Sequence, residues 1–482
     1  MRMDSGKPTI RKKGVRQGCL LIMSGFITVC SQVSHADNLM DLWRIAKLQD
    51  TKYLSASHKY LSDKEIIELS RADLLPSLAF QYEHKITDQT INESDNAVFT
   101  SGSDRYPTKT YGITLTQSVF DYSRWQRYSQ SKISANRAAI EYSLAKQQLL
   151  LRLAENYFLV LERVDQLETV RAEKKAMRKH LESSEKKYKS GLGSRVDVED
   201  ARARYLNAVS KEVELQSRLL DSRYALRESL GSMPGELSKL RPNIDLELPV
   251  PADPEEWVSM SAKNNLELHA IKLSLDEANK EIRVLRGGHY PTLDLVYTLE
   301  NTQTDGSVFG GGSDIDNSNI ILQLNVPLYS GGKTSSKLRA ALEERNSIFE
   351  DRNDKQRIVE REAHDAYHRI SAAIVQVGAL EQSVKARVVR LKSKTLGYRV
   401  GKDSLLHVLD AEQDLSEVKQ ALTKARYNYV LNVLRLKFAA GDLQEADLAT
   451  INGWLVGSLS SVPVMDVVTA AMIVSAEPEY DS

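Results

Sequence analysis

The sequence has no cysteine after residue 30 and no long apolar run. Its two cysteines, Cys19 and Cys30, both lie near the N-terminus. The chain beyond them has no thiol, so it can form no disulfide even in a compartment that would permit one. The apolar stretch between them is shorter than the roughly 20 residues that a membrane-spanning helix needs. We predict no transmembrane helix.

The N-terminal segment has the features of a secretory signal. Several basic residues precede the apolar stretch, and the small-x-small sequence Ser34-His35-Ala36 follows it. We expect residues 1–36 to be a signal peptide that is removed, so that the mature chain starts at Asp37. Lipid attachment at Cys30 is a less favoured alternative, because Val29 stands where a small residue is usual.

The balance of charge argues against a nucleic-acid partner. Removal of residues 1–36 takes away six basic residues and one acidic residue, which leaves a net charge of about −5. A protein that binds nucleic acid needs clustered excess cations to contact phosphates. No serine or cysteine nucleophile motif occurs either. The sequence predicts neither an enzyme nor a nucleic-acid-binding protein.

The mature sequence repeats its own pattern after roughly 210 to 216 residues. Trp43 recurs as Trp257, and Tyr188 recurs as Tyr398. Tandem halves predict two similar structural units related by pseudo-symmetry. A proline cluster separates them, and proline ends helices because it has no N–H donor. The expected domains are a signal peptide at 1–36, a first repeat at 37–232, a Pro-rich connector at 233–253, a second repeat at 254–448 and a C-terminal segment or tail at 449–482. Each repeat is expected to contain a helix, two strands, a long helix and a further helix, in that order.

Each half contains a segment that favours an unusually long helix. No glycine or proline occurs from Asp121 to Ser190, and such a helix would be on the order of 100 Å long at 1.5 Å per residue. The second half has a counterpart from Lys333 to Leu396, interrupted only by Gly378. Helices of this length must pack against one another along their length. The first carries an apolar stripe at helical spacing: Leu150, Leu153, Ala154, Tyr157, Leu161, Val164 and Leu167.

Each half also contains two strand-like segments of about ten residues. Their apolar residues alternate with polar ones, as Leu78, Phe80 and Tyr82 do with their neighbours. This alternation is typical of a lipid-facing barrel wall around a wet lumen. A soluble sandwich is the alternative, but it would need more strands. Polar loops are expected at Asn92 to Ser103 and at Thr304 to Asn319.

The number of strands predicts an oligomer. Four strands cannot close a barrel, and an open sheet edge in hydrocarbon costs several kcal/mol for each unpaired backbone group. The smallest membrane barrels have about eight strands, so closure needs at least two chains. Two chains would give a filled lumen, whereas three would give twelve strands and room for transport. Geometry favours a trimer without requiring it.

Five segments of the mature chain together carry a specific resemblance: Asp37–Met40, Leu115–Asp121, Gly288–Leu295, Val408–Ala411 and Ala425–Tyr429. Through them the chain resembles the TolC family of outer-membrane efflux channels along essentially its whole mature length. The resemblance implies an α+β membrane protein: a homotrimer whose twelve-stranded outer-membrane β-barrel, with four strands per chain, continues as a long periplasmic α-helical barrel. It implies the outer membrane of a Gram-negative bacterium as the location.

The same resemblance implies a passive exit duct. Such a duct would serve tripartite efflux pumps, type I secretion systems or both, and would export drugs, small molecules or proteins. Its partners would be a periplasmic adaptor and an inner-membrane transporter of the RND, ABC or MFS class, with no cofactor. The competing interpretation is a periplasmic coiled-coil adaptor without a pore. Adaptors carry one helical hairpin flanked by β-domains, whereas this chain has two tandem units.

Each long helix is expected to end at a glycine turn, with Ser194 and Ser404 as N-caps of the helices that follow. The resemblance implies that these turns dock the adaptor. The docking residues are then Gly191, Leu192, Gly193, Ser194, Gly401 and Ser404.

Just beyond the second turn, His407 and Asp410 lie three residues apart on one helix face. The family carries an aspartate at both positions, where they form a narrow acidic entrance. Asp410 keeps that residue and His407 replaces the other. Carboxylates brought together by symmetry repel one another and attract cations.

The resemblance further implies that a tyrosine and an arginine hold an aspartate in the closed state. Tyr398 and Asp197 match two of these positions. Asp403 stands in the place of the arginine, where it would repel Asp197. Lys402 is adjacent and is a candidate substitute.

Two other motifs are set aside. His364 and His368 are spaced like the ligands of a zinc protease, but Asp365 is too short to serve as the base and no third ligand is evident. The sequence Gly331-Gly332-Lys333-Thr334 resembles the end of a phosphate-binding loop, but Pro327 occupies the place of the first glycine. We predict no metal site.

We expect His407 to make the entrance weakly sensitive to pH, because imidazole titrates near neutrality. Cation selectivity, measured from single-channel reversal potentials, should be higher at pH 8 than at pH 5. Equal selectivity at the two pH values would contradict this role.

Overall fold

The computed structural model describes residues 37–93, 101–307 and 311–458. The predicted signal peptide and residues 459–482 lie outside this part of the chain. Within the described ranges, no helix combines the length and the apolar character needed to cross a membrane.

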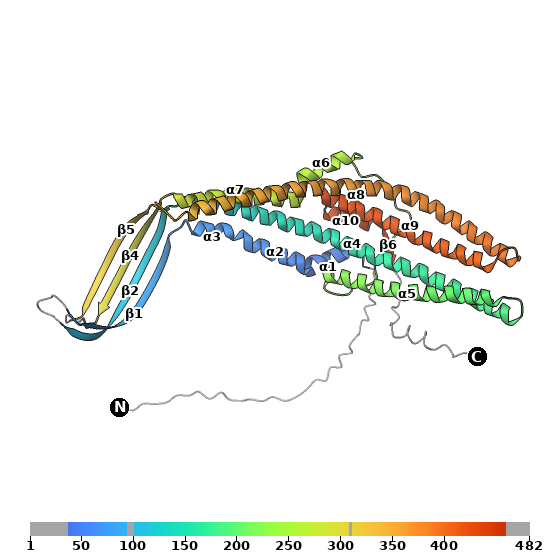
Figure 1. The fold of residues 1–482 in the computed structure, drawn as a ribbon, viewed down its shortest axis with the longest axis horizontal. Coiled ribbons are helices and arrows are strands. Elements are labelled where there is room, and N and C mark those ends of the chain that lie inside the picture. Colours follow the sequence, from blue (N-terminus) through green and yellow to red (C-terminus); the bar gives the residue numbers. More distant parts are fainter. Residues whose placement is uncertain (1–36, 94–100, 308–310, 459–482) are drawn as a thin grey trace, which may run out of the picture. The chain divides into compact units, whose positions relative to one another are not determined.

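In the first half, three short helices precede two strands and two long helices (Figure 1). The prediction gave one helix before the strands where the structure has three. The elements are α1 (Leu39–Gln49), α2 (Thr51–Lys64), α3 (Ile66–Ala72), β1 (Ser77–Ile91), β2 (Gly102–Phe120), α4 (Tyr122–Lys189) and α5 (Arg195–Leu230).

The second half follows the same order of helices, two long strands and two long helices, with short elements added at each end. The elements are β3 (Ser238–Leu240), α6 (Pro254–Asn264), α7 (Leu266–Arg286), η1 (Gly287–His289), β4 (Thr292–Thr304), β5 (Ser313–Asn325), α8 (Lys333–Arg399), α9 (Leu405–Ala439), α10 (Glu445–Asn452) and β6 (Leu455–Ser458).

The long helix of the first half has the bounds that its sequence predicts. Asp121 caps α4 by accepting a hydrogen bond from the backbone N–H of Arg124, and the helix continues to Lys189. Every residue of the predicted apolar stripe on α4 is buried. In the second half, α8 runs from Lys333 to Arg399 and passes through Gly378 without a break, so the predicted counterpart helix is confirmed. One glycine costs a helix only about 1 kcal/mol, which a helix of 67 residues can absorb.

The main hydrophobic core surrounds the middle of α4. Trp43 of α1, Tyr157 and Phe158 of α4 and Leu434 of α9 are all nearly inaccessible to solvent. Burying a side chain of this kind stabilises a fold by about 1.5–3 kcal/mol. The Tyr157 hydroxyl donates a hydrogen bond of 2.7 Å to the Ser238 carbonyl, which joins the connector to this core.

The four long strands form one antiparallel sheet in the order β1-β2-β4-β5 (Figure 1). They contain 15, 19, 13 and 13 residues, more than the ten predicted. The predicted loops were too long, because β2 already begins at Gly102 and β5 at Ser313. The extra residues of β5 are polar except for Ile315, which lies between Asp314 and Asp316, so they show no sustained apolar alternation.

The register of the sheet aligns apolar residues across all four strands. Leu78 pairs with Leu115, Leu115 with Tyr297 and Tyr297 with Ile320. The next apolar row joins Phe80 to Ile113. Directly paired residues point to the same face of a sheet, so these side chains form one apolar surface. Leu78 is 71% exposed and Ile320 is 76% exposed, so nothing in the described part of the chain covers these side chains.

The last described residues return to the connector. Strand β6 pairs with β3 in a separate two-stranded sheet, and Asp37 forms a bridge to Leu237 beside it. The C-terminal segment that we expected from residue 449 begins with the end of α10 and then β6.

Candidate functional site

The two long hairpins, α4–α5 and α8–α9, turn in the same way. Gly191 and Gly401 both have a φ of 75°, a left-handed conformation that glycine adopts without a steric penalty. Ser194 then caps α5 by accepting from Val196, and Ser404 caps α9 by accepting from His407. Both predicted N-caps are confirmed. Leu192, at the first turn, is 82% exposed.

A small apolar cluster joins the hairpins just behind the turns. Met177 of α4 packs with Leu405 and Leu409 of α9, and all three are buried. Tyr205 and Tyr398 lie against this cluster. The polar residues predicted to form the site are therefore attached to a common support.

Tyr398 is held by a lysine that the sequence analysis missed. The ammonium group of Lys187 donates a 2.7 Å hydrogen bond to the Tyr398 hydroxyl and lies 4.3 Å from the centre of its ring. Among the described residues, Tyr398 makes no hydrogen bond to Asp197, which is exposed near the start of α5. Lys187 and Tyr398 are 211 positions apart, so no local spacing pointed to the contact.

Asp403 has partners of its own within the chain. Its Oδ1 lies 2.8 Å from Lys394 Nζ and 3.1 Å from His407 Nδ1. The hydrogen bond from Lys394, assisted by the one from His407, lowers the pKa of Asp403 below its ordinary value. We expected Asp403 to act mainly by repelling Asp197, whereas its carboxylate is bound by nitrogen groups of α8 and α9. Lys402 is exposed and has no side-chain partner among the described residues.

The position of Asp403 depends on Gly397, a second residue that the sequence analysis missed. A Cβ atom on Gly397 would lie 2.3 Å from Asp403 Oδ2 and 3.1 Å from its Cγ. The Gly397 carbonyl also accepts hydrogen bonds from the backbone N–H groups of Lys402 and Asp403. A glycine six residues before an aspartate carries no recognisable signal.

Asp410 is ion-paired. Arg204 of α5 places Nη2 at 2.7 Å from Asp410 Oδ1 and Nη1 at 3.4 Å from Gln413 Oε1. The Asp410 carboxylate, which we expected to act in an acidic entrance, is therefore paired with a cation of its own chain. His407, one turn earlier, is exposed and touches Asp403 rather than Asp410. Arg204 was missed because it comes from the other half of the sequence.

The two histidines of α8 lie close together and point into solvent. The Nε2 atoms of His364 and His368 are 3.1 Å apart. Across the three described stretches, no group of three or more His, Cys, Asp or Glu side chains is arranged to hold a metal ion. Lys333 and Thr334 simply begin α8, with Gly332 as the N-cap.

The sequence matches one protein family over most of its length and resembles several characterised proteins. The sequence model of the family described as Outer membrane efflux protein matches it twice, over residues 48–232 and 257–442. It is 31% identical to Outer membrane protein TolC of Escherichia coli, an alignment that covers 92% of this chain and 89% of that protein. It is 27% identical to Alkaline protease secretion protein AprF of Pseudomonas aeruginosa, covering 89% and 90%.

Solved structures show the same fold at lower sequence identity. The Campylobacter jejuni CmeC outer membrane channel matches with a TM-score of 0.75 at 14% identity, covering 87% of this chain and 90% of that chain. The outer membrane protein VceC of Vibrio cholerae matches with a TM-score of 0.71 at 18% identity, covering 84% and 96%.

Substitution of Gly397→Ala should loosen the second turn, because the new methyl group would displace Asp403 from Lys394 and His407. We expect faster amide hydrogen exchange over residues 397–407. Gly378→Ala is the control, since a Cβ there would meet nothing within 4 Å. That variant should exchange as slowly as the parent or more slowly. Equal behaviour of the two variants would contradict the role assigned to Gly397.

Proposed function

The chain belongs to the outer membrane efflux protein family, and on that premise we propose that it is one subunit of a passive exit duct in the outer membrane of a Gram-negative bacterium. The exposed apolar surface of the sheet is the observation that supports this most directly. A surface of aligned Leu, Ile and Tyr side chains is unstable in water but is stable against lipid.

The edges of the sheet support a trimer. In the order β1-β2-β4-β5, one side of β1 and one side of β5 have no strand partner among the described residues. Hydrocarbon does not tolerate unpaired backbone groups, so copies must complete the wall. Three copies give a twelve-stranded barrel with an open lumen. The long helices of the two tandem repeats would continue this barrel into the periplasm.

We assign adaptor docking to the two hairpin turns. Gly191, Leu192, Gly193 and Ser194 form the first turn, and Gly401 with Ser404 forms part of the second. The exposure of Leu192 supports the assignment, because an apolar side chain left in water is available to a partner. The third component would be an inner-membrane transporter of the RND, ABC or MFS class.

The names of the relatives support the proposed cargo class. AprF of P. aeruginosa and the Dickeya chrysanthemi protein PrtF are both described as protease secretion proteins, whereas the matching family is described by efflux. A passive duct for secreted proteins, small molecules or both is consistent with the secretion proteins and with the efflux family. The alternative of a periplasmic adaptor without a pore explains neither the family match nor the apolar sheet.

We place the constriction at Asp410 and His407, and the contacts that hold it closed at Tyr398, Asp197, Lys402 and Asp403. Support comes from the cluster that joins the hairpins at this level, since separating them would break contacts of Tyr398. Lys187 joins this set through its hydrogen bond to Tyr398.

Reconstitution tests the duct and its gate together. The mature protein extracted from outer membranes should migrate as a trimer and should open rarely in planar bilayers. Tyr398→Phe removes the hydrogen bond from Lys187, so its open probability should rise several-fold. A water-soluble monomer without conductance would contradict the proposed function. Conductance that Tyr398→Phe leaves unchanged would remove only Tyr398 from the gate.

Arg204 should set the ion selectivity of the entrance. In Arg204→Gln, each subunit loses the cation that neutralises Asp410, so the cation-to-anion permeability ratio should rise at least twofold. Reversal potentials under a KCl gradient measure this ratio. Arg202→Gln is the matched control. Arg202 lies two positions before Arg204 and carries the same charge, but it pairs with Glu185 instead of Asp410. An equal rise in both variants would show that only net charge matters.

A further inference from the structure

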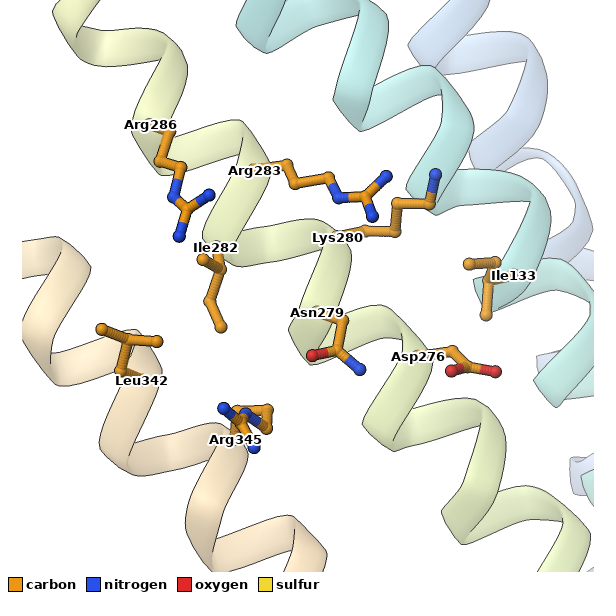
Figure 2. Close-up of a pocket in the computed structure, with 9 residues that line it drawn as sticks. All are labelled: Ile133, Asp276, Asn279, Lys280, Ile282, Arg283, Arg286, Leu342 and Arg345. Carbon is orange, nitrogen blue, oxygen red and sulfur yellow. The ribbon is translucent and has the colours of Figure 1, made fainter.

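A basic pocket lies on α7 and α8, away from the hairpin turns (Figure 2). Its volume is about 430 Å³, within the range of small-ligand sites. Figure 2 shows Arg283 and Arg286 projecting from neighbouring turns of α7, with Arg345 on the facing stretch of α8. Lys280 adds a fourth cation, and Asp276 is the one carboxylate in the lining.

The three arginines of this pocket differ from most others in the chain. Within the described ranges, none of Arg283, Arg286 and Arg345 has a carboxylate or any other side-chain partner. By contrast, Arg137, which reaches the other side of α7, binds both Glu277 and Glu141. Arg286 and Arg345 face the gap between α7 and α8, whereas Arg283 projects toward α4 (Figure 2). Cations that line one pocket without ion-pair partners repel one another, so the pocket as it stands is electrostatically incomplete.

One of these groups is also buried without a hydrogen bond. The Nε atom of Arg345 is inaccessible to solvent and has no partner. An unpaired buried donor costs about 1–3 kcal/mol and calls for a specific reason. An anion in the pocket would supply one, because it could accept from Arg345 and its neighbours at once. The side-chain amide of Asn279, which also lines the pocket, offers a further donor.

We propose that this pocket binds a phosphate group, carried by a lipid headgroup or by free phosphate. The guanidinium fork donates two parallel N–H bonds and matches the oxygens of phosphate. Several forks around one pocket therefore favour a phosphate over a carboxylate. Lys280 contributes less to phosphate binding than the arginines, because its ammonium group already donates a 2.9 Å hydrogen bond to Ser129 Oγ.

The place of the pocket along the chain makes a lipid headgroup an available source. Arg286 is the last residue of α7, and β4 begins six residues later at Thr292. Under the proposed function that strand enters the membrane, so Arg283 and Arg286 would lie at the level of the headgroups. Basic pockets beside membrane-spanning elements bind anionic headgroups in this way. The phosphate site itself does not depend on this placement.

Calorimetric titration of the detergent-solubilised full chain tests the site. One arm uses inorganic phosphate and the other uses dihexanoyl phosphatidic acid, which carries the same group on a lipid. The triple variant Arg283→Gln, Arg286→Gln, Arg345→Gln should bind both at least tenfold more weakly. The control is Arg44→Gln, Arg71→Gln, Arg218→Gln, which removes three exposed, ion-paired arginines and the same charge. It should bind as the parent does.

The two arms also separate the sources. Phosphatidic acid bound at least tenfold more tightly than inorganic phosphate assigns the site to a headgroup, and comparable affinities assign it to free phosphate. A triple Arg→Lys variant keeps the charge and the fold but loses the forks, so it should recover affinity only in part. No saturable binding by the parent, or equal losses in the Gln triple and the control, would overturn the proposal. Channel conductance measured on the same sample reports on the proposed function independently.

Discussion

The unpaired backbone edges of β1 and β5 are the constraint on which the rest of the molecule depends. Within the described residues, the sheet of four strands has an apolar face that nothing covers and two edges that no strand completes. Lipid can cover the face, but only further strands can complete the edges. Under the proposed function, assembly, membrane insertion and a lumen therefore depend on one another, and the helices that continue from the strands would share the symmetry of the closed wall.

The long helices could be read from the sequence because their signals are local. The absence of glycine and proline, the cap at Asp121 and the stripe on α4 together gave bounds within one residue. Strand lengths failed where the apolar signal ended, as at Asp314 and Asp316, since backbone pairing continues there without it. The caps at Ser194 and Ser404 were likewise local and correct.

The charges of the candidate site could not be predicted in the same way. Asp403 looked like a repulsive substitution and Asp410 looked like a bare carboxylate, because sequence shows a residue without its distant neighbours. Lys394 and Arg204 change both interpretations, and Arg204 comes from the opposite half of the chain. A resemblance to a family assigns a residue to a position in the fold. It predicts the electrostatic role of that residue only when the charged neighbours of the position are the same.

The unbroken course of α4 has a mechanical consequence. The helix starts at Tyr122, two residues after β2 ends at Phe120, and continues to Lys189 at the first turn. Over this length it contains no proline, no glycine and no change of helical type. Kinks arise at such interruptions, so the segment has no internal hinge. The helix therefore moves as one rigid body. A displacement at its hairpin end must make α4 rotate or slide against α5 and α9. Resistance to that motion then resides in side-chain contacts between helices, which substitution can adjust one at a time.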